Sequence, residues 1–272
     1  MAASVNPNGP LKGKTALVTG ASRGIGEAVA VRLAMAGARV VCTARTTDQA
    51  ESRLPGTLGD TIERIRRAGG QATAVKADLA QAADRERLIE EAVAAYGPVD
   101  ILVNNAAVTF FLPIETFPTK RFDLMIEVQV WAALHLSQLV LPHMRAQKSG
   151  AIVTLSSGAA IHPVKPYEGI RPGGTVYGMC KAALERFSTG LAAEVYADNI
   201  TVNAISPGLV ATPGVAVHNL ITEATKHRVS PVENIAEAVY QIVTRDPKQM
   251  TGRIDHAGPF LAEFGVAASE LV

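Results

Sequence analysis

The chain has 272 residues, of which 48% are hydrophobic and 19% are charged, and its formal net charge is +1. This composition is typical of a folded globular protein and excludes a disordered one. The small net charge favours neither nucleic acid nor a membrane as a partner, and no uninterrupted apolar run reaches the roughly 18 residues of a membrane-spanning helix. The two cysteines, Cys42 and Cys180, form neither a disulfide framework nor a metal motif. Since the first ten residues show no signal-peptide pattern, we expect a cytoplasmic protein.

Short segments rich in Val, Ile and Thr alternate with longer amphipathic segments from residue 13 onwards. The predicted strands are 15–18, 38–43, 72–76, 100–103, 151–155, 200–205 and 251–256. The predicted helices are 27–33, 57–68, 84–96, 119–144, 175–196 and 231–243. This alternation is typical of βαβ units, so residues 13–272 are predicted to form one α/β domain with a doubly wound parallel sheet and helices on both faces. Residues 1–12 are predicted to be a flexible N-terminal tail.

Two segments are longer than the usual connection between a strand and a helix. Residues 45–55 form a polar insertion, and residues 158–174 form a loop rich in proline and glycine. The second loop begins after a predicted strand, at the edge of an open parallel sheet where ligands bind. We therefore interpret it as a candidate wall of a substrate pocket, with a solvated loop of no specific role as the alternative.

The stretch 19–26 lies between the first predicted strand and the first predicted helix, which is the context that a phosphate-binding loop requires. Glycine has no Cβ, so backbone N–H groups can approach a pyrophosphate closely, and the helix N-terminus adds partial positive charge. An ordinary turn that happens to contain three glycines is the alternative. The candidate cofactor-binding residues of this loop are Gly20, Ser22, Arg23, Gly24, Ile25 and Gly26.

Ala44 and an arginine, Arg45, stand at the end of the second predicted strand. A site for NAD commonly has an Asp or Glu about 20 residues after the glycines, where it accepts from the ribose hydroxyls. A guanidinium instead matches a phosphate, and Arg23 inside the loop supplies a second one. The sequence therefore favours NADP(H) over NAD, unless Arg45 merely begins an exposed loop.

Tyr177 and Lys181 are four residues apart on a predicted helix and therefore share one face. An ammonium group near a phenol favours the phenolate, so we expect the pKa of Tyr177 to be lowered toward neutrality. Such a tyrosine can exchange a proton with a carbonyl or alcohol oxygen while a nicotinamide cofactor exchanges a hydride. Alone, this spacing is weak evidence.

Six motifs occur together in one order along the chain. They are Thr19-Gly20-x3-Gly24-Ile25-Gly26, Asp78-Leu79, Asn104-Asn105-Ala106-Ala107, Ser157, Tyr177-x3-Lys181 and Pro207-Gly208-Leu209-Val210-Ala211-Thr212. With these motifs, the chain resembles the short-chain dehydrogenase/reductase family over residues 12–258. The resemblance implies a Rossmann-type fold, a small-molecule carbonyl or alcohol substrate, and assembly as a homo-oligomer, either a tetramer or a dimer.

The resemblance also implies a role for individual residues. Tyr177 is expected to be the general acid/base, Lys181 to tune it and bind the nicotinamide ribose, and Ser157 to donate to the substrate oxygen. Neighbouring Ser156 is the weaker candidate. The further cofactor-binding residues implied by the resemblance are Asp78, Leu79, Asn105, Ala106, Pro207, Gly208, Val210 and Thr212.

The sequence departs from the family pattern at three places. Gln129 replaces the asparagine that usually holds a water for a proton relay, and its longer side chain can reposition that relay. Ser157 and Tyr177 are 20 positions apart, which is longer than usual because of the 158–174 loop. Residues 251–258 differ from the family's usual ending, a segment that often helps to form the tetramer.

These features predict an NADP(H)-dependent enzyme that interconverts a carbonyl and a secondary alcohol of small to medium, apolar character. Phe110, Phe111 and Leu112 are candidates for an apolar pocket or for the core. No metal is expected, because the six histidines show no metal-binding spacing. An NADP-binding regulator without activity is one alternative, suggested by Gln129. An interaction protein that binds no nucleotide is the other.

Overall fold

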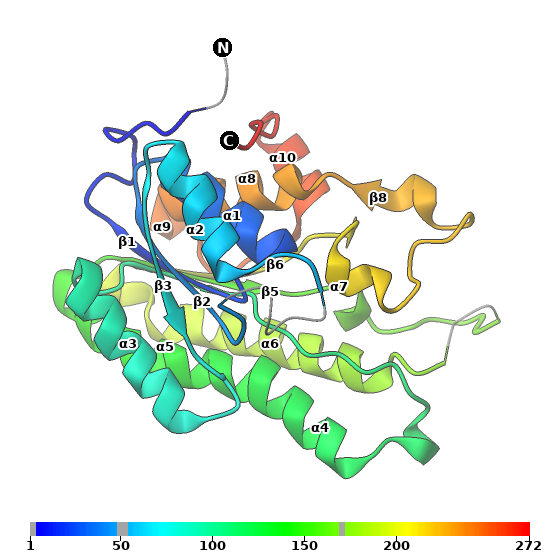
Figure 1. Ribbon diagram of the computed structural model, residues 1–272. Coiled ribbons are helices and arrows are strands. Elements are labelled where there is room, and N and C mark those ends of the chain that lie inside the picture. Colours follow the sequence, from blue (N-terminus) through cyan, green and yellow to red (C-terminus); the bar gives the residue numbers. More distant parts are fainter. Residues whose placement is uncertain (1–3, 48–53, 169–171) are drawn as a thin grey trace.

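The architecture is a twisted parallel sheet covered by helices on both faces, as Figure 1 shows. The structure is a computed structural model that describes residues 4–47, 54–168 and 172–272. Seven strands lie in the order β3-β2-β1-β4-β5-β6-β9, and every neighbouring pair is parallel. The strands are β1 Thr15–Thr19, β2 Arg39–Ala44, β3 Gln71–Lys76, β4 Ile101–Asn104, β5 Gly150–Leu155, β6 Ile200–Ser206 and β9 Ile254–His256. The predicted doubly wound α/β fold is confirmed.

Two groups of helices sandwich the sheet and form the two halves of the core. On one face lie α1 Gly24–Met35, α2 Leu58–Arg67, α8 Val232–Thr244 and α10 Ala257–Glu263. On the other lie α3 Ala82–Tyr96, α5 Ala132–Gln147 and α6 Thr175–Glu194. Because both faces are covered, every position of β1 and β6 is buried, including polar residues such as Thr15, Thr201 and Asn203.

The remaining elements are short and lie mostly at the edges of the sheet. They are α4 Thr119–Met125, α7 Pro213–Ala216, α9 Pro247–Met250, the paired strands β7 Leu209–Val210 and β8 Val229–Ser230, and the 3₁₀ turns Ile114–Thr116, Gly158–Ala160, Tyr196–Asp198 and Lys226–Arg228. Local sequence explains one of the helix ends clearly. Thr57 and Asp60 form a reciprocal capping box at the start of α2, which satisfies two backbone N–H groups.

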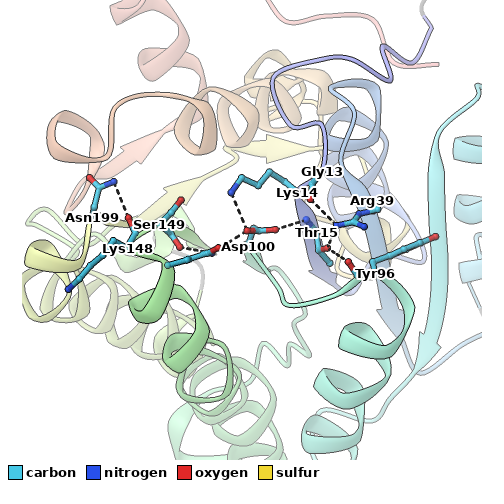
Figure 2. Close-up of polar contacts among 10 residues, drawn as sticks. Gly13, Lys14, Thr15, Arg39, Tyr96, Asp100, Lys148, Ser149 and Asn199 are labelled. Atoms are coloured by element: carbon cyan, nitrogen blue, oxygen red, sulfur yellow. Dashed lines mark hydrogen bonds and ion pairs between the residues drawn. The ribbon is translucent and has the colours of Figure 1, made fainter.

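Asp100 joins the amino ends of several strands, as Figure 2 shows. Its carboxylate accepts from the backbone N–H of Thr15 (2.8 Å), from Lys14 Nζ (3.2 Å) and from Gln147 Nε2 (3.2 Å). Nearby, the Thr15 hydroxyl donates to the carbonyl of Tyr96 (2.9 Å). These contacts stabilise the amino edge of the sheet, so the opposite, carboxyl edge is the one that is open to a ligand.

Residues 4–12, predicted to be a flexible tail, instead lie against the end of α1. The N–H of Asn6 donates to the Met35 carbonyl and the N–H of Leu11 to the Ala36 carbonyl, both at 2.9 Å, and the Leu11 side chain is buried. At Gly9, a Cβ would lie only 2.4 Å from the Ala36 oxygen. The contacts are mainly made by backbone atoms, so no apolar periodicity revealed them.

The helix predicted at 119–144 runs on to residue 147 and contains a π-helical segment, Ile126–Trp131, between α4 and α5. A π segment widens the helix by one residue and is often found at functional sites. By length and composition alone, this helix could cross a membrane, and within the described ranges no other helix could. It packs on the sheet and on α3 and α6, as the core helices of soluble proteins also do.

Candidate active site

The glycine loop at the carboxyl end of β1 has no room for larger residues. At Gly26, a Cβ would lie 2.2 Å from the Gly20 carbonyl oxygen and 2.5 Å from Asn105 Nδ2. At Gly24, φ is +58° and a Cβ would lie 3.0 Å from Thr212 Cγ2. The backbone at the start of α1 therefore carries no side chain at Gly24 and Gly26, as the close approach of a pyrophosphate requires. The loop fits a dinucleotide.

Asn105 and Ala106, at the end of β4, hold the glycine loop in place. Asn105 Nδ2 donates to the Thr19 carbonyl at 2.7 Å. The backbone N–H groups of Asn105 and Ala106 donate to the Thr19 hydroxyl at 2.9 and 3.0 Å. The side-chain amide of Asn105, predicted to bind the cofactor, is thus engaged by the loop itself.

Two arginines flank the loop at the edge of the sheet. Arg45 directly follows β2 and is exposed. Arg23 precedes α1, and its Nη2 donates to the Gly56 carbonyl at 2.7 Å, while partial burial lowers the pKa of its guanidinium. Because β1 and β2 are parallel neighbours, both side chains belong to the carboxyl edge of the sheet. Residues 48–53 of the predicted insertion lie outside the described residues.

Asp78 and Leu79 follow β3 at the same edge. Asp78 Oδ1 accepts from the N–H of Ala80 at 3.1 Å, and the N–H of Asp78 donates to Asp84 Oδ2 at 2.7 Å. Leu79 is buried and lines a small cavity under the loop. Asp78 is half-buried, and because β2 and β3 are parallel neighbours, it follows β3 at the same edge where Arg45 follows β2.

Ser157 and Tyr177 are brought together from opposite ends of the long loop. Ser157 follows β5 and caps the turn Gly158–Ala160, where its hydroxyl accepts from the N–H of Ala159 at 3.2 Å. It also hydrogen-bonds the phenol of Tyr177 in the first turn of α6. Ser156 lies elsewhere, because its hydroxyl donates to Glu185 Oε1 at 2.6 Å. The structure thus gives the side chains of these two adjacent serines different partners, which the sequence alone did not distinguish.

Lys181 is buried one turn after Tyr177. Its Nζ donates to the Leu155 carbonyl at 2.8 Å and lies 5.7 Å from the centre of the Tyr177 ring. Burial lowers the pKa of Lys181 to about 8. Burial also raises the pKa of Tyr177, although the hydrogen bond from Ser157 opposes this. The expected lowering of the Tyr177 pKa is therefore wrong for the protein alone, because desolvation of the phenolate outweighs the influence of its neighbours.

Gln129 projects from the π segment into the space below Lys181. Its Nε2 donates to the Val108 carbonyl at 2.8 Å. Gln129 Oε1 and both polar side-chain atoms of Asn104 are buried without a partner among the described residues. These residues line, with Lys181 and Leu79, a cavity of about 10 Å³. A polar cavity of this size suits one water molecule.

Aromatic residues border Tyr177 on its outer side. The ring of Phe111 lies 5.4 Å from that of Tyr177 and 4.9 Å from that of His218, edge-on in both cases. Gly173, near the end of the long loop, packs on the backbone of Phe111, since a Cβ there would lie 3.0 Å from the Phe111 carbonyl carbon. Residues 161–168 of this loop are exposed, and residues 169–171 lie outside the described residues.

The segment after β6 closes the site opposite the glycine loop. Gly208 has a φ of +76°, Val210 is buried in β7, and the Thr212 hydroxyl accepts from the N–H of Val215 at 3.2 Å, which caps α7. Thr212 also faces Gly24, as described above. Pro207 stands between this turn and the end of β6.

Comparison with known proteins decides the family. The sequence model described as short chain dehydrogenase matches residues 14–220. A tropinone reductase homolog of Arabidopsis thaliana is 35% identical over 204 residues, which cover 75% of this chain and 70% of the relative. A solved short chain dehydrogenase of Mycobacterium thermoresistibile is 34% identical with a TM-score of 0.80, covering 94% of this chain and 89% of that one. This chain belongs to the short-chain dehydrogenase/reductase family.

A further solved structure adds a ligand to this comparison. A metagenomic short-chain oxidoreductase in complex with NADP is 30% identical to this chain with a TM-score of 0.73, and the match covers 91% of this chain and 98% of the other. As a short-chain dehydrogenase/reductase, the protein is an oxidoreductase of a family that uses nicotinamide cofactors.

The short-chain dehydrogenase/reductase motifs predicted from the sequence all lie along the carboxyl edge of one sheet. Two residues near Tyr177 and Gln129 were not singled out. His218 is one of the six histidines without metal-binding spacing, and no pattern in the sequence connects it with the ring of Phe111 beside Tyr177. Arg85, on α3, is buried and donates to the carbonyl of Leu79, which lines the cavity, and a lone arginine in an amphipathic helix carries no sequence signal. No cluster of residues suited to a metal ion occurs in ranges 4–47, 54–168 and 172–272.

Proposed function

We propose that this protein is an NADP(H)-dependent oxidoreductase that interconverts a carbonyl and a secondary alcohol, with Tyr177 as the general acid/base. The observation that carries the proposal is the placement of Ser157, Tyr177 and Lys181 at the same sheet edge as the glycine loop. When bound there, the nicotinamide cofactor supplies or accepts the hydride.

The proton chemistry follows from the environments of the two titratable groups. Since the pKa of Tyr177 is raised, its phenol keeps its proton at neutral pH and can give it to a carbonyl oxygen. Lys181, with a pKa of about 8, is mostly charged at neutral pH and stabilises the phenolate that forms. Ser157 donates to the same substrate oxygen as negative charge develops on it.

Gln129 supports the return of the proton to Tyr177. A water in the cavity between Gln129 Oε1 and Lys181 would find a hydrogen-bond acceptor and a donor there. In this proposal, Gln129 performs the task of the usual asparagine from a π-helical segment, which moves the amide relative to a regular helix.

The preference for NADP(H) rests on charge at the end of β2. Arg45 is exposed at the position where a carboxylate would select NAD, and Arg23 stands at the start of α1, on the same edge of the sheet. Both guanidinium groups suit a 2′-phosphate. The NADP complex of the metagenomic relative supports the same choice.

The substrate pocket is proposed to be apolar and of small to medium size. Phe111 borders Tyr177, and the exposed side chains Ile161 and Val164 belong to the loop that begins at Ser157. The reductase named among the relatives supports a carbonyl substrate.

Two measurements on the purified protein test this function. A fluorescence titration is expected to show NADPH binding, and NADPH oxidation is expected with members of a panel of apolar ketones and aldehydes. The absence of nucleotide binding would contradict the proposal in favour of an interaction protein. Tight binding without turnover across the panel, in both directions, would instead favour a regulator.

A further inference from the structure

Arg85 is a fully buried arginine on α3, and its guanidinium contacts three separate segments. It has 1% of its surface exposed. Its Nη1 donates to the Leu79 carbonyl (2.5 Å) and pairs with Glu127 Oε1 (2.7 Å), while its Nε donates to His135 Nδ1 (3.0 Å). The three partners belong to the loop after β3, to the π segment and to α5.

A buried arginine is a costly way to pack a helix. Removing a guanidinium from water carries a large penalty, which an ion pair and hydrogen bonds only offset when their geometry is good. An apolar side chain of similar volume would often pack the same place at least as well. The segments that Arg85 joins therefore point to a role beyond packing.

Both backbone segments that Arg85 holds border the cavity under the cofactor loop. Leu79 lines that cavity and directly follows Asp78, on the Arg45 side of the proposed cofactor site. Glu127 is two residues before Gln129 in the same π segment, and Gln129 lines the cavity together with Lys181. Through one side chain, the Arg45 side of the cofactor site and the proposed proton-transfer side are thus fixed to each other.

We propose that Arg85 is a positioning residue that sets both the loop 78–79 for cofactor binding and the π segment for proton transfer. The inference rests on the proposed function, because it assumes that NADP(H) occupies this edge of the sheet. Glu127 serves as the partner for the π segment alone, and the Leu79 carbonyl as the partner for the loop alone. The two effects can therefore be separated by substitution.

Arg32 provides a matched control on the other face of the sheet. It is also buried, with 8% exposed, and its Nε pairs with Glu237 Oε2 at 2.6 Å between α1 and α8. Neither residue lines the cavity. Arg32→Met removes an ion pair of the same kind, so it is expected to lower the unfolding temperature while NADPH affinity and kcat stay within twofold of wild type.

The test compares Arg85→Met, Arg85→Lys and Glu127→Gln with wild type and Arg32→Met, each checked for folding by thermal unfolding. NADPH affinity is measured by fluorescence titration and kcat at saturating NADPH. Arg85→Met is expected to weaken NADPH binding and to lower kcat, each by about tenfold, because small displacements at a reacting site are costly. Arg85→Lys keeps the charge but not the several N–H donors of the guanidinium, so it is expected to recover only part of the NADPH affinity and of kcat.

Glu127→Gln keeps the shape of the side chain and keeps the protein testable even if Arg85→Met does not fold. It is expected to lower kcat by several-fold with unchanged NADPH affinity, because only the π segment is released. Wild-type NADPH affinity and kcat in Arg85→Met, or an unchanged kcat in Glu127→Gln, would overturn the inference and leave Arg85 a structural residue. A wild-type protein that binds no NADPH would instead refute the proposed function itself.

Discussion

The hydroxyl of Ser157 hydrogen-bonds the phenol of Tyr177 in the first turn of α6, while that of neighbouring Ser156 donates to Glu185, eight residues further along the same helix. Two adjacent serines thus have different partners, although their sequence context is almost the same. In the proposed mechanism, only Ser157 can donate to a substrate oxygen that Tyr177 protonates.

The paired variants Ser157→Ala and Ser156→Ala follow from this difference. Removing one donor to a developing oxyanion costs about 100-fold in kcat, so Ser157→Ala is expected to lose activity to that extent. Ser156→Ala loses a bond to Glu185 away from the substrate and is expected to stay within about threefold of wild type. Steady-state kinetics with a carbonyl substrate measure both. Equal losses in the two variants would contradict the assignment of Ser157.

Arg45→Asp tests the choice between the two nicotinamide cofactors. A carboxylate repels the 2′-phosphate, and the loss of a charge-assisted hydrogen bond is worth roughly tenfold or more in binding. The KM for NADPH is therefore expected to rise at least about tenfold, while the KM for NADH changes little. The NADH measurement is the internal control. A similar change in both KM values would contradict the proposal that Arg45 selects NADP(H).

Gly26→Ala tests the glycine loop at the start of α1. The added Cβ would lie 2.2 Å from the Gly20 oxygen, so the loop must move away from the position that a pyrophosphate needs. We expect a loss of about 1–3 kcal/mol in the free energy of unfolding, as for other overpacked sites, together with NADPH binding weakened at least tenfold.

Gly258→Ala is the control for this loop variant. Among the residues that the structure describes, apart from its chain neighbours and the backbone of its own helix, none has an atom within 4 Å of a Cβ at Gly258, in the first turn of α10. The free energy of unfolding is expected to change by less than about 0.5 kcal/mol, and the NADPH affinity is expected to stay the same. If Gly26→Ala behaved like Gly258→Ala, the close approach at the loop would not matter.

The lowered pKa of Lys181 leads to a specific dependence of protein stability on pH. Its pKa is about 8 in the folded protein and near the ordinary lysine value when unfolded, so between these values the unfolded chain binds more protons. Stability from this group therefore rises with pH from about 8 to about 10.5 and is constant below 8. Integrated over that window, the contribution is on the order of 3 kcal/mol.

The measurement compares urea unfolding of wild type and Lys181→Met from pH 7 to 10.5. Groups common to both proteins cancel, so the free energy of unfolding of wild type relative to the variant is expected to rise across the upper part of this range. A difference that falls or stays flat above pH 8 would show that Lys181 is not a lysine whose charge is disfavoured by burial.

The alternation of strands and helices, the two layers of helices and the position of the site could be predicted from the sequence, because each depends on local pattern. A parallel sheet covered on both faces favours apolar strands such as β4, and most of the motif residues stand directly after strands. The docking of residues 4–12 could not, since it depends on backbone contacts with the end of α1. The π segment could not either, because it continues the predicted helix and differs from it only in its backbone hydrogen bonds.

The electrostatics of the site were harder to predict than its residues. The spacing of Tyr177 and Lys181 indicates proximity, yet burial decides the direction of both pKa shifts, and burial is set by β5, α6 and the π segment together. In the same way, the partner of Ser156 is 29 positions away on α6. Only the assembled fold shows these relations.

NADPH oxidation by the Tyr177→Phe variant, with a ketone that the wild-type protein reduces, tests the central claim most directly. Phenylalanine keeps the ring beside Phe111 but has no proton to give, so turnover is expected to fall at least about 1,000-fold while NADPH binding stays measurable. Turnover equal to that of wild type would contradict the account.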